Sequence, residues 1–145
     1  MTDTPRTLRA GMVGMGMIFD ETYRPCFERL HAEGLYDRRY GEVSVPLTAV
    51  ASRTGKRADV YQKSSQGRIA PFANFSGEDA VAKLLESDVD FVCVATPDDR
   101  HFEACRQVLE AGKHLIVEKP SVLSLSQLDE LAQLAKAKGV LAKVV

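Results

Sequence analysis

Two closely spaced glycines are the first residues in the chain whose spacing could serve a ligand. Gly14 and Gly16 lie in the segment GMGMIF, residues 14–19, directly after an apolar run. A GxGxxG loop at this place turns tightly, lets a diphosphate approach the backbone and packs the next helix against its strand. Phe19 replaces the third glycine, but the first turn of a helix still presents N–H groups to an anion. We therefore expect a diphosphate loop made by Gly14, Met15, Gly16, Met17 and Ile18, with an unliganded glycine turn as the alternative.

Hydroxyl and basic side chains end the second expected strand, near residues 45–52. In folds that bind NAD, this strand ends in an acid that accepts hydrogen bonds from the ribose hydroxyls, and no acid is present here. Hydroxyls beside a guanidinium and an ammonium suit a 2′-phosphate instead. The pattern predicts NADP rather than NAD, bound by Ser52, Arg53, Thr54 and Lys56, with Arg57 close by. The alternative is an ordinary solvated, basic start to a helix.

A lysine follows the fifth expected strand, residues 114–117, at the edge where open parallel sheets place ligands. Lys119 there could polarise an alcohol or carbonyl oxygen, or help to transfer its proton. The alternative is an exposed ion pair between Glu118 and Lys119. His101 has two interpretations that the sequence leaves open: it contacts a cofactor from the first turn of its helix, or it only caps and packs.

Short apolar runs alternate with segments of helical period along the chain, which is typical of βα units around a parallel sheet. We expect strands at 8–15, 45–52, 70–75, 89–95, 114–117 and 140–145. Helices are expected within 18–33, 55–66 and from 76, then after a cap at Asp98 or Asp99, and after a capping box at Ser124 or Ser126. Residues 34–42 form a polar insertion, and Pro25 either lies in a first helical turn or kinks its helix. The pattern predicts a three-layer α/β fold, an open doubly wound parallel sheet in the order 3-2-1-4-5-6.

Length and composition limit the classes of function. The 145 residues predict one domain over 1–145, and 19 basic against 20 acidic residues give no field that would attract nucleic acid or a membrane surface. Three cysteines without a CxxC pair and three histidines without paired ligand spacing predict neither disulfide nor metal. No signal peptide or membrane span is evident, so we expect a soluble, cytoplasmic protein.

Two further segments carry a more specific pattern. Residues 95–101, ATPDDRH, are followed by AGKHLIVEKP, residues 111–120. In order and spacing they resemble the ATPN…H…AGKHV…EKP pattern of the Gfo/Idh/MocA oxidoreductases, and the resemblance extends from the glycine loop to the last helix. It implies a Rossmann domain that binds NAD(H) or NADP(H). It also implies a second, mostly β-sheet domain for sugars, inositols or related polyols, and hydride transfer between the nicotinamide and a substrate carbon.

The resemblance also implies roles for individual residues. It assigns Gly14 and Gly16 to the diphosphate, Ser52–Thr54 to the adenosine ribose, Thr96 and Pro97 to the wall beside the cofactor, and Glu118, Lys119 and Pro120 to the nicotinamide end. Lys119 is the residue nearest the chemistry. Phe19 and Asp98 depart from the pattern, where a small residue and an asparagine are usual.

The remaining catalytic groups, usually an aspartate and a histidine, lie in the family's second domain, whose sequence is absent from these 145 residues. We therefore expect a cofactor-binding domain that binds NADPH and is inactive by itself, with a sugar or polyol substrate and possible homo-oligomers. The alternatives are a non-catalytic nucleotide sensor or regulatory module, or a module that binds coenzyme A or another nucleotide.

Overall fold

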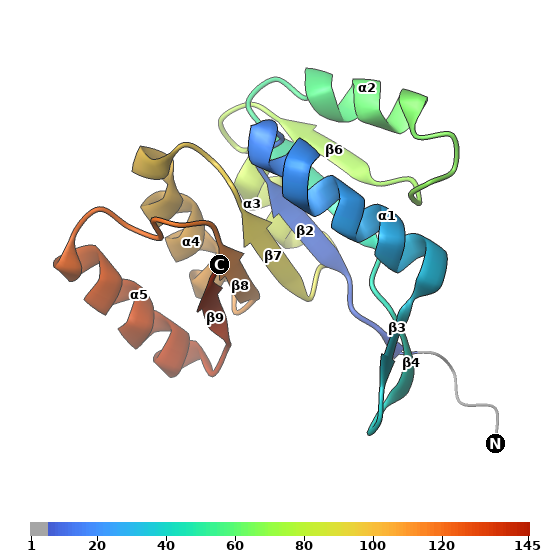
Figure 1. Ribbon diagram of the computed structural model, residues 1–145. Coiled ribbons are helices and arrows are strands. Elements are labelled where there is room, and N and C mark those ends of the chain that lie inside the picture. Colours follow the sequence, from blue (N-terminus) through green and yellow to red (C-terminus); the bar gives the residue numbers. More distant parts are fainter. Residues whose placement is uncertain (1–5) are drawn as a thin grey trace.

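A six-stranded parallel sheet forms the centre of the protein, whose computed structural model describes residues 6–145 (Figure 1). The strands are β2 (Ala10–Val13), β5 (Leu47–Ser52), β6 (Ala73–Ser76), β7 (Phe91–Val94), β8 (His114–Val117) and β9 (Ala142–Val144). Their order in the sheet is β6-β5-β2-β7-β8-β9. Counted along the chain this is 3-2-1-4-5-6, so the predicted doubly wound topology is confirmed. The direction of winding reverses between β2 and β7, which is where open sheets form a ligand crevice.

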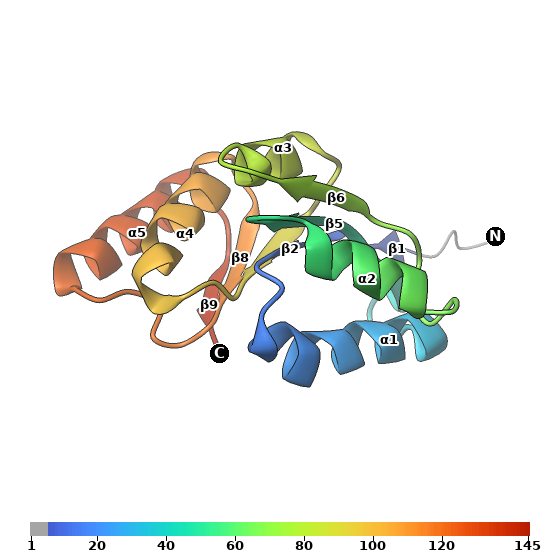
Figure 2. The same cartoon turned by 90° about the horizontal axis from the view of Figure 1, so that it is seen from above.

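Helices cover both faces of the sheet and give the three predicted layers (Figure 2). On one face lie α1 (Arg24–Glu33) and α2 (Lys56–Ser64), and on the other α3 (Ala80–Glu86), α4 (His101–Glu110) and α5 (Leu125–Lys138). The side chains of a strand point alternately to the two faces, so each strand contributes to two cores. Met12 and Cys93 pack under α1 and α2, whereas Val13 and Val92 belong to the cluster under the other layer.

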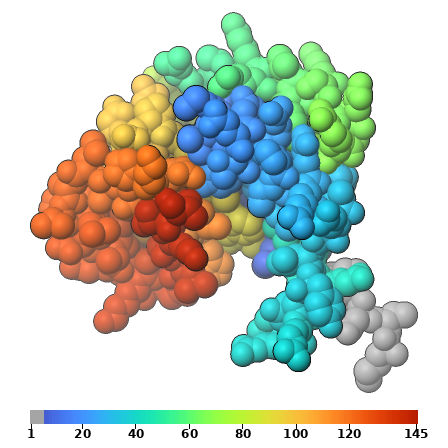
Figure 3. All heavy atoms as spheres, in the orientation of Figure 1, coloured from blue at the N-terminus to red at the C-terminus, as the bar shows by residue number. Residues whose placement is uncertain are grey.

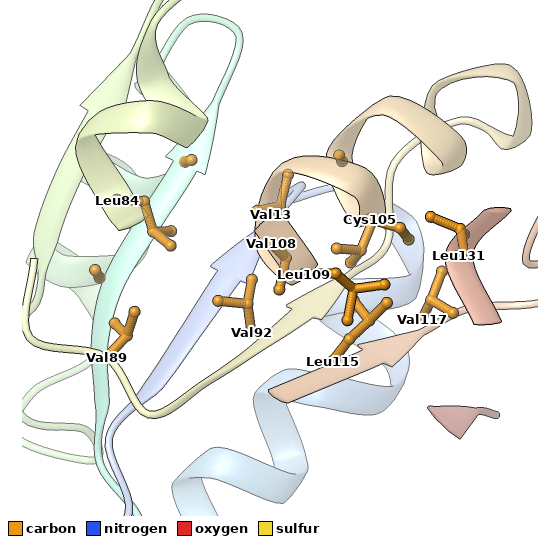
Figure 4. Packing of buried hydrophobic residues seen from close by; sticks show 14 of the residues in the cluster. Val13, Leu84, Val89, Val92, Cys105, Val108, Leu109, Leu115, Val117 and Leu131 are labelled. Carbon is orange, nitrogen blue, oxygen red and sulfur yellow. The ribbon is translucent and has the colours of Figure 1, made fainter. Parts of the chain in front are cut away.

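The cluster under α3, α4 and α5 includes side chains of β7 and β8, the strands that precede Thr96 and Lys119. Figure 4 shows Val92 of β7 and Leu115 of β8 facing Val108 and Leu109 of α4. All four side chains are at most 2% exposed. Burying aliphatic side chains of this size stabilises the folded chain by about 1.5–3 kcal/mol each. The packing therefore fixes the positions of β7 and β8, and with them the first residues of the loops that follow.

The helix that follows the glycine loop begins irregularly. A π-helical turn, η1, covers Phe19–Tyr23 and leads directly into α1, where Pro25 lies in the first turn. Pro25 thus has the first of its two expected positions, in the first turn of α1, but helical residues are continuous from Met17 to Glu33. The π-helical turn directly before Pro25 is the irregularity that accompanies a proline within this longer helical segment.

Two predicted helix starts have different outcomes. Ser124 caps α5, and its Oγ accepts a hydrogen bond from the Gln127 backbone N–H at 3.3 Å. The caps predicted at Asp98 or Asp99 are wrong. These residues form a 3-10 turn, η2 (Asp98–Arg100), without a side-chain cap, and α4 begins only at His101.

The polar insertion is a second small sheet. β3 (Leu35–Asp37) and β4 (Gly41–Ser44) form an antiparallel hairpin, and β1 (Arg6–Thr7) pairs with β4 in parallel. Asp37 organises the turn, since its Oδ1 accepts the N–H groups of Arg39 and Tyr40. The hairpin extends from the body of the molecule at the end of α1, as Figure 3 shows in cyan.

No helix among residues 6–145 combines the length and the apolar character needed to cross a membrane.

Candidate functional site

The sheet brings four sequence motifs to one edge. Val13 at the end of β2 pairs with Ala51 of β5 and Val94 of β7, and Val94 pairs with Val117 of β8. The glycine loop, residues 14–18, follows β2, and the Ser52 loop, residues 52–55, ends β5. The Thr96 loop, residues 95–97, follows β7, and the Lys119 loop, residues 118–120, follows β8. The predicted site residues, spread over more than 100 positions of sequence, therefore surround the switch point between β2 and β7.

The two glycines of the loop have different surroundings. Gly14 has φ +98°, and a Cβ placed on it would lie 2.4 Å from the Ala95 carbonyl oxygen. Only glycine fits this close approach of two backbones. At Gly16, by contrast, no atom of the described chain other than those of Gly16 and its two neighbours in sequence lies within 4 Å of the place that a Cβ would take. Gly14 is thus required by the protein itself, whereas Gly16 faces open space.

Phe19, at the place of the missing third glycine, belongs to the core. Its side chain is fully buried and packs edge-to-face on Tyr61 of α2, with ring centroids 5.5 Å apart. A third glycine would let the helix approach the strand closely. Here an aromatic ring fills the corresponding space, and the irregular π-helical turn η1 begins at this residue.

The Ser52 loop is polar and open. Ser52 Oγ accepts a hydrogen bond from the Gly55 N–H at 3.1 Å, which closes the turn before α2. Arg53, Thr54 and Lys56 are exposed, so their donors are available to a ligand.

Arg57 connects this region to the glycine loop. Its Nη1 donates to the Met15 carbonyl oxygen at 3.0 Å, and its Nη2 lies 3.6 Å from Asp20 Oδ2. An open depression of about 330 Å³ lies between the start of α1, with η1, and α2. It is lined by Asp20, Arg24, Lys56, Arg57, Val60, Tyr61 and Ser64. Three of these seven side chains are cationic and one is anionic, so the depression favours an anion.

Glu118 and Lys119 do not pair with each other. The Tyr23 hydroxyl donates to Glu118 Oε1 at 3.0 Å, which ties the carboxylate to the helix after the glycine loop. Burial raises the pKa of Tyr23, so the phenol keeps its proton and remains a donor. Lys119 is exposed and forms no ion pair with any residue in 6–145. The structure therefore contradicts the alternative interpretation, in which Glu118 and Lys119 form an ion pair.

The Thr96 loop holds one unsatisfied polar group. Thr96 Oγ1 is buried and has no hydrogen-bond partner within the described part of the chain. A buried hydroxyl without a partner costs about 1–3 kcal/mol, so a donor or acceptor supplied at this edge of the sheet would be stabilised there.

His101 does not face the open edge. Its side chain is 1% exposed, and each ring nitrogen lies 2.7 Å from a backbone carbonyl oxygen. No ring nitrogen is left for a cofactor. Of the two interpretations of His101, the geometry favours packing and support over direct contact.

Comparison with known proteins gives the family. Residues 8–145 match the Gfo/Idh/MocA family, described as an oxidoreductase family with an NAD-binding Rossmann fold. The chain belongs to this family. Its strand order, its glycine loop and the EKP sequence after β8 are therefore features of a Gfo/Idh/MocA Rossmann domain.

Relatives within the Gfo/Idh/MocA family are longer than this chain. Oxidoreductase YdgJ of Escherichia coli is 42% identical over 110 residues, which cover 73% of this chain and 31% of YdgJ. D-xylose 1-dehydrogenase (NADP(+)) of Hypocrea jecorina is 31% identical over 134 residues, or 92% of this chain and 32% of that enzyme. The crystal structure of KijD10, a 3-ketoreductase from Actinomadura kijaniata in complex with TDP-benzene and NADP, superposes with a TM-score of 0.74 at 28% identity. It covers 97% of this chain and 38% of KijD10. The chain thus spans about a third of the curated relatives it matches.

The sequence did not predict the contacts that Tyr23 and Arg57 make at the site. Tyr23 has a detectable signal, because Phe19, Tyr23 and Phe27 follow a spacing of four and all three are buried. This stripe predicts a core face, although not the hydrogen bond to Glu118. The contact of Arg57 with Met15 joins residues 42 positions apart and has no local signal.

Within residues 6–145 no three His, Cys, Asp or Glu side chains gather in a way that could hold a metal ion.

Proposed function

We propose that the chain is the cofactor-binding domain of an oxidoreductase and that it binds NADP across the carboxyl ends of β2, β5, β7 and β8. The observation that carries the proposal is the open space at Gly16, beside a loop whose neighbouring glycine is fixed against Ala95. An open backbone turn before a helix suits a diphosphate. The unsatisfied Thr96 Oγ1 lies at the same edge of the sheet, so the residues present fit a dinucleotide.

Each part of the site would hold a different part of the cofactor. The loop from Gly14 to Ile18 would bind the diphosphate, the Ser52 loop the adenosine ribose, and Thr96, Pro97 and Glu118 would line the nicotinamide end. When bound, the nicotinamide supplies or accepts a hydride. With the carboxylate of Glu118 engaged by Tyr23, the Lys119 ammonium is free to polarise a substrate oxygen and to hold or transfer a proton there.

The preference for NADP over NAD rests on charge. Arg53, Lys56 and Arg57 follow the end of β5 and are exposed. Arg57 is held beside the glycine loop by the Met15 carbonyl and Asp20, which leaves Arg53 and Lys56 as the cations without such contacts among the described residues. A guanidinium binds a phosphate through two charge-assisted hydrogen bonds. The name of the D-xylose dehydrogenase and the NADP in the KijD10 crystal support the same choice.

The names of two relatives support a sugar or polyol as the substrate class. A D-xylose dehydrogenase and a sugar 3-ketoreductase act on sugars, so we infer that the complete enzyme oxidises a sugar or polyol alcohol or reduces the corresponding carbonyl group. A second domain would supply the substrate contacts. Three cysteines without disulfides suit a reducing compartment, which favours the cytoplasm.

Titration of the 145-residue chain with NADPH and with NADH tests the cofactor assignment. The chain contains no Trp, so the fluorescence of the nicotinamide can be followed directly. We expect NADPH to bind at least tenfold more tightly, a difference of about 1.4 kcal/mol. Tighter binding of NADH would refute the preference for NADP. Absence of binding to either cofactor at millimolar concentration would refute the proposed function.

The role of Lys119 has a separate test in the complete enzyme. Lys119→Ala should lower kcat by a factor of about 10²–10⁴, the usual contribution of a general acid or base, because no other group replaces the ammonium. NADPH affinity should remain within about threefold of the wild-type value. Unchanged turnover would favour the alternative of a non-catalytic nucleotide sensor.

A further inference from the structure

One buried histidine joins the two loops that carry Thr96 and Lys119. His101 is the first residue of α4. Its Nε2 lies 2.7 Å from the Thr96 carbonyl oxygen, in the loop after β7. Its Nδ1 lies 2.7 Å from the Pro120 carbonyl oxygen, in the loop after β8. A single ring therefore spans the two loops at the switch-point edge of the sheet.

The chemistry of these two contacts makes the ring a structural link. A carbonyl oxygen only accepts hydrogen bonds, so an imidazolium donates to both oxygens and a neutral ring to one of them. Both distances lie at the short end of the range for N–H···O bonds. The ring itself is 1% exposed. Removing its donors would take a hydrogen-bond partner from the Thr96 and Pro120 carbonyl groups, which the ring contacts in a partly buried setting.

We propose that His101 is a positioning residue that sets the spacing between the Thr96 loop and the Lys119 loop, and thereby forms the wall for the nicotinamide end of the cofactor. The inference rests on the proposed function, which assigns the nicotinamide end to these two loops. The adenosine end is assigned to the Ser52 loop after β5, which His101 does not contact. Loss of His101 should therefore affect one half of the cofactor and not the other.

Three substitutions in the 145-residue chain separate the two hydrogen bonds. His101→Phe keeps a ring and removes both ring nitrogens. His101→Asn keeps an amide N–H near the position of Nδ1, and His101→Gln keeps one near the position of Nε2. Calorimetry would measure the Kd of each variant for NADPH and for adenosine 2′,5′-bisphosphate, which is the adenosine half of NADP without the nicotinamide.

The two ligands should respond differently. We expect His101→Phe to raise the Kd for NADPH about tenfold, the effect of losing one to two buried hydrogen bonds, and to leave the Kd for the bisphosphate within twofold. The Asn and Gln variants should give intermediate values for NADPH, because each keeps one donor. His31→Phe is the matched control: His31 is exposed on α1, so both affinities should be unchanged.

Two outcomes would overturn the role of His101. One is a folded His101→Phe variant that binds NADPH as tightly as the wild type, and the other is an equal loss of affinity for both ligands, which marks a general structural role. If circular dichroism shows that the Phe variant is unfolded, the Asn and Gln variants decide by the same two criteria. A wild-type chain that binds no NADPH would overturn the proposed function itself, and this inference with it.

Discussion

Gly14 and Gly16 are equivalent in the sequence pattern but not in the structure, and alanine at each position should separate two effects. At Gly14 a Cβ would meet the Ala95 carbonyl oxygen at 2.4 Å, with φ at +98°. We expect Gly14→Ala to lower the free energy of unfolding by about 2–4 kcal/mol, because backbone strain and a backbone clash add together. Urea unfolding measures this loss.

Gly16→Ala is the matched variant, because apart from the two neighbours in sequence no described residue lies within 4 Å of the added Cβ. We expect its stability to remain within about 1 kcal/mol of the wild type. Its NADPH affinity should fall at least tenfold, because the methyl group would occupy the space assigned to the diphosphate. A stable Gly14→Ala chain, or a Gly16→Ala chain that binds NADPH normally, would contradict this account of the loop.

Residue types and spacing were sufficient to predict which side chains meet at the switch point, but not which atoms they contact. The glycines, the Ser52 loop and Lys119 all follow strands, so their meeting depends only on strand order. The hydrogen bond from Tyr23 to Glu118 joins a residue of η1 to one that directly follows β8, 95 positions later, and no local pattern predicts it. For the same reason the sequence left the role of His101 open.

At the scale of elements, β2 and β7 are also held together at the edge opposite to the site. Asp90, directly before β7, accepts hydrogen bonds from the Arg9 backbone N–H at 2.7 Å and from Arg9 Nε at 3.0 Å. The hydrogen bond to the Arg9 side chain holds the pKa of the Asp90 carboxyl below its usual range. A carboxyl whose pKa is lower in the folded state contributes stability above about pH 4 and loses it as the pH falls.

Asp90→Asn should therefore lower the free energy of unfolding by about 1 kcal/mol at pH 7, a value reduced for partial solvent exposure. The difference from wild type should shrink as the pH falls from about 7 to about 3, because the Asp90 carboxyl takes up a proton in the unfolded chain at a higher pH than in the folded chain. Urea titrations at the two pH values measure it. Asp129→Asn, on the exposed side of α5, provides the control and should change stability little at either pH. A difference that persists unchanged at pH 3 would exclude the Arg9–Asp90 pair as its cause.

The elements that the sequence predicted are those with a periodic apolar pattern. The strand at His114–Val117 was predicted with its observed bounds, and the strand predicted at 70–75 is observed at Ala73–Ser76. The hairpin could not be predicted in this way, because all three residues of β3 are exposed and show no alternation. The caps at Asp98 and Asp99 were wrong because a 3-10 turn precedes α4.

At the scale of the whole molecule, each side of the sheet contains one buried thiol. Cys93 belongs to the core under α1 and α2, Cys105 to the core under α3, α4 and α5, and Cys26 is exposed. Burial raises the pKa of Cys93 and that of Cys105 to about 12. At pH 8 neither forms the reactive thiolate, so we expect Ellman's reagent to modify one thiol in the native chain and all three in guanidinium chloride.

Cys26→Ser gives the control for this measurement, since the native variant should then contain no thiol that reacts rapidly. The two slow thiols report on different layers of the fold. Rapid modification of Cys93 or Cys105 in the native chain would show that the corresponding layer opens without global unfolding, contrary to the packing described here.

The pairing of β2 with β7 joins segments 81 positions apart, and this distance determines when the site can form during synthesis. During synthesis, β2 and its glycine loop are made before β5 and β7, and β5 is the first of the two strands that can pair with β2. The other side of β2 has no partner until Phe91–Val94 has been made, and the loop of Lys119 is made later still. A nascent chain that lacks β7 and the Lys119 loop therefore contains only part of the nucleotide site. The cofactor can stabilise the fold only after most of the domain has emerged.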